Sequence, residues 1–292
     1  KKYMETLLTV IQTISDFLWG TPMTVALIGT GLYLSIKFKF RYITKIKFHF
    51  QNTFGKMFKG KGEGEGTVSG FAAACTAMAN TIGVGNIGGV ATAITMGGPG
   101  AIFWMWIIAF FGMATIYAEA VLAQETRVIH EDGSVSGGPV FYIKKAFNNK
   151  FGSFLAVFFA VAIILALGFM GCMVQSNSIA EACTNAFGIP GWVMGLIVAA
   201  LAGFIFLGGI NRIASVTEKL VPIMAALYLL FGLIILIARI RYIPETFGMI
   251  FKYAFQPQAI IGGGFGYAIK TAISQGAKRG LFSNEAGMGS TP

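Results

Sequence analysis

The chain has 292 residues, of which 55% are hydrophobic and only 12% are charged, and its mean hydropathy is +0.71. Soluble domains carry about 25% charged residues, so this composition excludes an ordinary soluble domain and indicates a protein embedded in a lipid bilayer. The formal net charge of +10 does not indicate a nucleic-acid partner, because many of the basic residues fall in one short stretch between apolar segments.

That basic stretch covers 37–61 and is typical of a cytoplasmic loop, because Lys and Arg accumulate on the cytoplasmic side of membrane proteins. One apolar span, 17–36, precedes it, and an amphipathic lead-in at 4–16 comes before that span. We therefore expect residues 1–66 to form an extra N-terminal transmembrane helix and a basic cytoplasmic loop. The basic residues of the loop are Lys37, Lys39, Arg41, Lys45, Lys47, Lys56, Lys59 and Lys61.

Further apolar segments follow in chain order, each close to the 20 or so residues that a helix needs to cross a bilayer. We expect 174–188 to be an external connection and 243–257, with its spaced Phe residues, to lie at the membrane interface. Alternation from the cytoplasmic loop makes the first of these segments cross outward and the last cross inward. The expected spans are 67–96, 101–126, 151–173, 189–210, 217–240 and 259–289.

Segment 67–96 contains a run, Asn80–Gly89, that is unsuited to a helix interior, because each glycine costs about 0.5–1 kcal/mol relative to alanine. An opened helix leaves backbone N–H and C=O groups without partners, which is costly in hydrocarbon unless water, an ion or a substrate binds them. An amino acid and a cation meet both needs, since a carboxylate suits the N–H groups and a cation suits the carbonyls. The alternative is close helix packing through Gly85 and Gly89, although packing leaves the amides of Asn80 and Asn86 unexplained.

Segment 259–289 shows the same features and predicts a second interrupted helix. Glycines at 262–264 and 266 open it, and Ser274, Gln275 and Gly276 fall near the expected mid-depth of the membrane. Two interrupted helices of opposite direction, five spans apart, are what an inverted repeat of five helices produces. We therefore expect 67–240 to be a first five-helix repeat and 259–292 to be the start of a second, in a chain that is part of a longer one.

Several other residues within or near the spans are functional candidates. Arg279 and Glu285 are candidates for a gating ion pair, or Arg279 is a cytoplasmic anchor at the helix end. For Glu119 we favour a structural carboxylate over a proton or cation site. Phe169 is a candidate for closing over a ligand, and Gln175 is a further polar candidate. Cys172 and Cys183 flank the expected external connection, where a disulfide is conceivable.

One sequence motif resembles the signature of the alanine or glycine:cation symporter family, within the amino acid-polyamine-organocation superfamily. It begins with Gly97-Gly98-Pro99-Gly100, continues through Phe103-Trp104-Met105-Trp106 and ends at Gly112. The run Ser283-Asn284-Glu285-Ala286-Gly287-Met288-Gly289-Ser290 resembles a second hallmark of the family, and 83–89 fits the glycine-rich stretch before the signature. The resemblance extends over the whole chain.

The resemblance implies an all-α polytopic protein of the plasma membrane with a leucine-transporter-like fold, in which inverted five-helix repeats are preceded by one extra helix. It further implies sodium-coupled symport of alanine or glycine by alternating access, with no enzymatic activity, no cofactor and no metal beyond the transported sodium. The cation would bind backbone carbonyls near Thr76, Ala79 and Asn80, together with a hydroxyl from a later helix. The substrate would bind at the two unwound segments, to Asn80, Thr81, Gly85, Asn86, Phe169, Ser274, Gln275 and Gly276.

Three other functions compete with sodium symport. A channel requires a continuous polar path, whereas these spans contain isolated polar positions, and a proton-coupled transporter of another small solute would use the same broken helices. A membrane enzyme requires a nucleophile with an acid/base partner or a metal site, and both histidines, His49 and His130, fall in expected loops.

Overall fold

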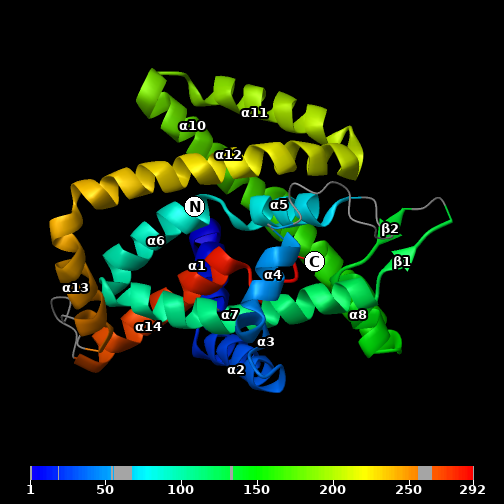
Figure 1. Ribbon diagram of the computed structural model, residues 1–292, viewed down its shortest axis with the longest axis horizontal. Helices are drawn as coiled ribbons and strands as arrows, with labels where there is room; N and C mark the ends of the chain where they lie inside the picture. The colour runs from blue at the N-terminus through cyan, green and yellow to red at the C-terminus, as the bar shows by residue number, and fades with distance from the viewer. Residues whose placement is uncertain are drawn as a thin grey trace. The chain divides into compact units, whose positions relative to one another are not determined.

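The computed structural model describes residues 2–18, 20–53, 55, 68–131, 134–255 and 265–291, and it is almost entirely helical (Figure 1). The expected all-α class is confirmed. Among the described residues the only strands are β1 (Val128–Ile129) and β2 (Val135–Ser136), which pair antiparallel in a short hairpin. Lys56, Lys59 and Lys61 of the basic loop and the glycines at 262–264 lie outside the described residues.

Within the described part of the chain, four helical stretches have the length and the composition to cross a membrane. The first is formed by α1 (Lys2–Leu18) and α2 (Thr21–Lys37), and short helices α3 (Arg41–Thr44) and α4 (Ile46–Thr53) follow it. The others are Gly100–Glu125, Lys150–Phe187 and Gly209–Ala238, and α11 (Gly191–Phe206) is a shorter apolar helix. Each of the four stretches, like α11, overlaps an expected span, and the expected spans 67–96 and 259–289 are not among the four stretches found in the described residues.

The chain divides into two compact units, which we describe separately. Unit 1 comprises Lys1–Thr44, Gly85–Ala118 and Arg239–Gly287, and unit 2 comprises Lys45–Val84, Glu119–Ala238 and Met288–Pro292. The helix α7 (Gly100–Glu125) contributes to both units, and so does the interrupted segment formed by α5 (Gly70–Thr81) and α6 (Val84–Gly97).

The core of unit 1 forms around α14 (Phe265–Asn284), which contacts α6 and α7 through small residues. The buried core residues Ala277 and Leu281 of α14 pack with Ile108 of α7. Small residues let helix backbones approach closely in a membrane, where no hydrophobic force drives association. Ala93 of α6 and Ala272 of α14, both fully buried, show how close this approach is.

The signature motif at the start of α7 packs against α13 (Ile243–Phe255), which follows the short 3-10 helix η2 (Ile240–Tyr242). The indole N–H of Trp104 donates to the Ala254 carbonyl at 3.2 Å, and the Phe103 ring lies edge-on to Phe255 with centroids 5.1 Å apart. Gly100 lies so close to the Tyr253 carbonyl that no Cβ fits there. The aromatic run therefore positions an amphipathic helix, which is where we expected an interfacial stretch.

Unit 2 contains α5 packed on α12 (Gly209–Ala238), and α8 (Pro139–Ala146) packed on α9 (Lys150–Ile163). Side chains cap two of these helices, because Ser69 accepts from the Ala72 N–H and Asn149 accepts from the Gly152 N–H. Pro222 lies inside α12 and has no N–H to donate to the Glu218 carbonyl.

The stretch expected as an external connection, 174–188, is helical up to Phe187. The chain continues from α9 through the π-helix η1 (Ile164–Gly171) into α10 (Cys172–Phe187), and only Gly188, with φ of 69°, ends it. The polar side chains of α10 lower its hydropathy, but they do not break its backbone hydrogen bonding. Packing against α11 supports the additional turns.

Candidate functional site

The first interrupted helix is present, and its opening is narrower than expected. Helix α5 ends at Thr81, α6 begins at Val84, and only Ile82 and Gly83 between them leave the helical path. Ile82 is extended, with φ −87° and ψ 109°. The expectation that the whole of Asn80–Gly89 is irregular is therefore wrong, because residues 84–89 are wound into α6.

Gln175 of α10 contacts the break directly. Its side-chain Oε1 accepts a hydrogen bond from the Val84 N–H at 3.1 Å, and its Nε2 lies where a Cβ on Gly83 would be. The first N–H groups of a helix have no partner within the helix, so a side-chain amide here supplies an acceptor that the backbone cannot. Sequence reasoning named Gln175 only as a further polar residue, because nothing local indicates which helix it faces.

Helix α10, which provides Gln175, is preceded by the wide turns of the π-helix η1, which contain Phe169. Single-turn π-bulges are frequent at functional sites, and this π-helix ends four residues before Gln175. The Phe169 side chain is 61% exposed, so it does not close a pocket in this structure. Its candidate role as a lid stays a prediction.

The last turn of α5 contains two of the three residues expected to bind the cation. Ala79 and Asn80 lie in this last turn, whose carbonyls point along the helix axis toward the break. The Met78 carbonyl accepts from the Ile82 N–H at 2.8 Å, and the Thr81 hydroxyl donates to the Ala77 carbonyl at 3.1 Å. These contacts define the helix end that faces the break.

Thr76, the third residue expected to bind the cation, lies one turn before that end. Its hydroxyl lies 2.8 Å from the Ala72 carbonyl and 2.9 Å from the hydroxyl of Thr217 in α12. The Thr76 side chain therefore bridges α5 to α12 in this structure, a contact that sequence reasoning missed because it joins residues 141 positions apart.

The second segment is not interrupted where we expected it to be. Helix α14 runs unbroken from Phe265 to Asn284, so Ser274, Gln275 and Gly276 are helical. A Cβ on Gly276 would lie 2.6 Å from the Ala101 carbonyl oxygen and 2.7 Å from Cβ of Trp104. The glycine therefore allows α14 to lie against the backbone of α7, which is the packing explanation that glycines in membrane helices often have.

Gln275 and Asn86 lie at opposite ends of α6, although both were expected in one substrate shell. Cβ of Gln275 is 3.1 Å from where a Cβ on Gly97 would be. Gly97 follows Asn86 by three turns, or about 16 Å along a helix axis. An amino acid with a side chain of one methyl group does not reach both residues. The two were predicted together because only their polarity and expected depth were visible in the sequence.

Asn86 ties the start of α6 to the end of α14. Its side-chain amide donates to the Ser283 carbonyl at 3.2 Å, which is one of the last carbonyls of α14 and has no helical partner of its own. A Cβ on the neighbouring Gly85 would lie 3.2 Å from the Phe282 ring. Both residues serve helix packing in this structure.

The backbone beyond Asn284 is irregular. Glu285, Gly287 and Gly289 all have positive φ values, of 53°, 84° and 69°. Glu285 is nearly buried, at 9% exposure. The candidate role of Arg279 and Glu285 as a gating ion pair stays a prediction.

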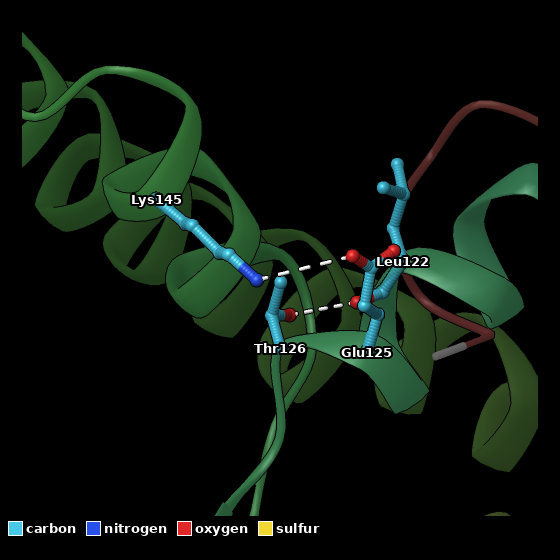
Figure 2. A network of polar contacts seen from close by, with 4 residues as sticks. All are labelled: Leu122, Glu125, Thr126 and Lys145. Carbon is cyan, nitrogen blue, oxygen red and sulfur yellow. Dashed lines mark hydrogen bonds and ion pairs between the residues drawn. The ribbon is translucent and has the colours of Figure 1, made fainter.

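Glu119 lies near Tyr142 of α8, and its role as a structural carboxylate stays a prediction. Burial, followed by the nearby Glu119 carboxylate, raises the pKa of Tyr142 to about 12. Figure 2 shows a separate network close by, in which Lys145 of α8 pairs with Glu125 of α7 at 4.0 Å. The same view shows the Thr126 hydroxyl donating to the Leu122 carbonyl at 2.7 Å. The ion pair is largely exposed and contributes at most about 1 kcal/mol.

The described residues contain no cluster of His, Cys, Asp or Glu that could hold a metal ion. Cys75, Cys172 and Cys183 are free thiols, so the conceivable disulfide between Cys172 and Cys183 is absent. Cys172 and Cys183 both lie in α10, because the connection expected between two spans is a helix.

Comparison with known proteins identifies related chains. The sequence profile described as the sodium:alanine symporter family matches residues 4–292. The sodium/alanine symporter AgcS of Methanococcus maripaludis is 45% identical over 285 residues, which cover 97% of this chain and 62% of that protein. The amino-acid carrier protein AlsT of Bacillus subtilis is 39% identical over 97% of this chain and 58% of its own length.

A third relative, named "Probable sodium/glutamine symporter GlnT" in Bacillus subtilis, is 38% identical over 97% of this chain and 57% of its own length. The chain thus spans about three fifths of the length of the curated relatives that it matches. These names are those of transporters, and the chain is not an enzyme but a multi-pass protein of the plasma membrane. The match of the family profile to nearly all of its residues shows that this chain belongs to the sodium:alanine symporter family.

Proposed function

We propose that this chain forms part of a secondary active transporter that couples sodium to the uptake of a small neutral amino acid, alanine or glycine. The substrate binds beside the two-residue break between α5 and α6 and crosses the membrane by alternating access. Family membership supports the transported chemistry, and the break supports the location.

The observation that carries the proposal is the hydrogen bond from the Val84 N–H to Gln175. An opened backbone in a membrane persists only where a polar group binds it. A substrate carboxylate is a stronger acceptor than a neutral amide, because hydrogen bonds to charged groups contribute about twice as much as neutral ones. The carboxylate therefore takes the N–H at the start of α6, and the freed amide of Gln175 donates to it.

The cation is proposed to bind at the other side of the break, at the carbonyl end of α5. Ala79 and Asn80 lie in the last turn, where helix carbonyls carry partial negative charge. Carbonyl oxygens at the C-terminal ends of half-helices are typical sodium ligands in transporters. Sodium and a carboxylate bound to adjacent helix ends stabilise each other, which couples the two.

Substrate size is proposed to be limited by the apolar side chains around the break, including Ile82. An apolar pocket separates substrates that differ by one methyl group by only about 1–3 kcal/mol. Alanine and glycine are therefore both expected to be transported. That relatives are named for alanine and for glutamine supports a substrate side-chain size that differs between family members.

The test is transport by the full-length protein reconstituted in liposomes. Labelled alanine, glycine and leucine are offered with an inward sodium gradient, with a proton gradient alone, and with neither. We expect alanine or glycine uptake that depends on sodium, and no uptake of leucine. Uptake driven by the proton gradient alone would show a proton-coupled transporter, and non-saturable flux would show a channel.

Variants then test the site. Asn80→Ala and Gln175→Met are expected to weaken apparent alanine affinity by about tenfold each, as for the loss of a hydrogen bond to a charged group. Gln124→Met is the matched control, because the Gln124 side chain accepts only from nearby Arg127 at the exposed end of α7. If Gln275→Ala weakens alanine binding as much as Asn80→Ala does, the site extends to α14 and the location proposed here is wrong.

A further inference from the structure

The contact between α5 and α12 contains a pair of hydroxyl groups that the proposed binding site does not use. The Thr76 and Thr217 oxygens lie 2.9 Å apart. The Thr76 hydroxyl also lies 2.8 Å from the Ala72 carbonyl, and that of Thr217 lies 3.0 Å from the carbonyls of Ile213 and Ala214. Each hydroxyl has one proton, so one hydroxyl donates across the contact, and the other accepts that bond while it donates to a carbonyl of its own helix.

The part-buried hydroxyl pair is flanked by buried small residues on both helices. Cys75 is fully buried, and Ala72 on the same face of α5 is 4% exposed. On α12, Ala214 and Val221 are 4% and 3% exposed, and they lie one turn before and after Thr217. A hydroxyl pair between two closely packed helix faces fixes the rotation of one helix against the other, because rotation of either helix separates the two hydroxyls.

The position of the pair relates it to the helix end that faces the break. Thr76 precedes Ala79 and Asn80 by three and four residues, which is one turn of α5. Rotation of α5 about its axis would swing the carbonyls of its last turn by the same angle. Helix α12 has its own weak point next to the pair, since Pro222 gives no hydrogen bond to Glu218.

We propose that Thr217 is a positioning residue for transport, which holds α5 through Thr76 so that the last-turn carbonyls of α5 face the sodium ion. This inference rests on the proposed function for its transport effect. Its structural part, that the hydroxyl pair keeps α5 closed on α12, stands separately. Thr217 touches neither substrate nor cation.

Cys75 is a native reporter of the α5–α12 contact, because it is buried there and is a free thiol. In full-length protein with Cys172 and Cys183 replaced by Ser, the rate of alkylation of Cys75 by a membrane-permeant maleimide measures how often the contact opens. Thr217→Val keeps the shape of the side chain and removes the hydroxyl. We expect it to raise the alkylation rate about threefold, the factor that an average polar contact between membrane helices provides.

Three variants make the test specific. Thr217→Ser restores the hydroxyl and should return the rate to that of the parent. Thr76→Val should raise the rate as Thr217→Val does, and the double variant should add nothing further, because both changes remove one contact. Thr95→Val is the control, since that hydroxyl bonds only within α6, to the Thr92 carbonyl at 3.0 Å.

In transport assays, Thr217→Val should raise the half-saturating sodium concentration about threefold while the maximal rate of alanine uptake is largely retained. Equal alkylation rates in the parent and in both Val variants would overturn the proposal. Faster alkylation of Cys75 with an unchanged sodium dependence of uptake would show that the hydroxyl pair serves helix packing alone, and would refute the positioning role of Thr217. If the parent protein shows no sodium-dependent uptake, the proposed function fails, and the alkylation result still decides the structural part.

Discussion

The break between α5 and α6 and the middle of α14 are both rich in small residues, but their glycines have different neighbours. Beside Gly83 lies the side-chain amide of Gln175, and the backbone there is open. Beside Gly276 lie the backbone and Cβ atoms of α7, and the helix is continuous. A glycine that admits a neighbouring backbone serves packing, whereas a glycine at an open backbone next to an amide presents hydrogen-bonding groups to a ligand.

The largest effect is expected from Gly276→Ala. Its Cβ would meet the Ala101 carbonyl at 2.6 Å, and backbone atoms do not move aside as a flexible side chain does. Overpacking of this kind costs about 1–3 kcal/mol, so the melting temperature of the purified protein should fall. Gly232→Ala in α12 is the control, because no heavy atom lies within 4 Å of its added Cβ. Equal melting temperatures would show that α14 does not pack on α7 in this way.

Gly83→Ala should separate binding from stability. The added methyl group displaces the end of the Gln175 side chain, which is flexible, so the fold has room to adjust. The hydrogen bond to the Val84 N–H is lost, and apparent alanine affinity should fall about tenfold while the melting temperature without substrate changes little. A variant that melts much lower but binds alanine normally would assign Gly83 to packing and remove the distinction drawn here.

A smaller effect is expected from Asn86→Ala. The variant leaves the Ser283 carbonyl without the amide that contacts it, which costs about 1 kcal/mol for a neutral hydrogen bond. Thermal unfolding in detergent measures this loss. Asn52→Ala is the matched control, since the Asn52 amide donates only to Phe48 in its own exposed helix. If Asn86→Ala weakens alanine binding without lowering stability, Asn86 belongs to the substrate site after all.

The smallest effect is expected from Gly89→Ala. Its Cβ would lie 3.9 Å from Cδ of Arg279, which is an ordinary contact. The better helix propensity of alanine, about 0.5–1 kcal/mol, then offsets any crowding, so stability should be unchanged or slightly raised. Gly85→Ala, with a contact of 3.2 Å to the Phe282 ring, should be mildly destabilising by comparison. If Gly89→Ala proved more destabilising than Gly85→Ala, α6 and α14 would pack in a different register.

The position of the spans could be predicted well because it depends on composition along the chain. The span expected at 101–126 matches the helix Gly100–Glu125, and a helix, Ile243–Phe255, fills most of the stretch 243–257. The break in 67–96 could also be predicted, since the glycines between Thr81 and Gly89 weaken a helix locally. Its width could not, because contacts of Gly85 and Gly97 with α14 stabilise the turns that glycine alone destabilises.

The part of the candidate site that lies beside the glycines in the sequence could be predicted, whereas contacts from distant helices could not. Asn80 and Thr81 were identified from their place beside the glycines, and they do adjoin the break. Gln175 and Thr217 were not assigned their contacts, because they come from helices far along the chain. Ser274 and Gln275 have the polarity of binding residues, but their helix is supported on two sides by close packing, which the sequence does not display.

Composition and local pattern by themselves determined that this protein is helical, that it lies in a membrane and where its backbone is weakest. These properties follow from hydropathy and helix propensity, which act over a few neighbouring residues. Tertiary structure alone decided which weak point opens and which side chain meets it. Those outcomes depend on the atoms of distant helices, such as Gln175 beside Val84 and Ala101 beside Gly276, whose proximity is set by packing of the folded chain.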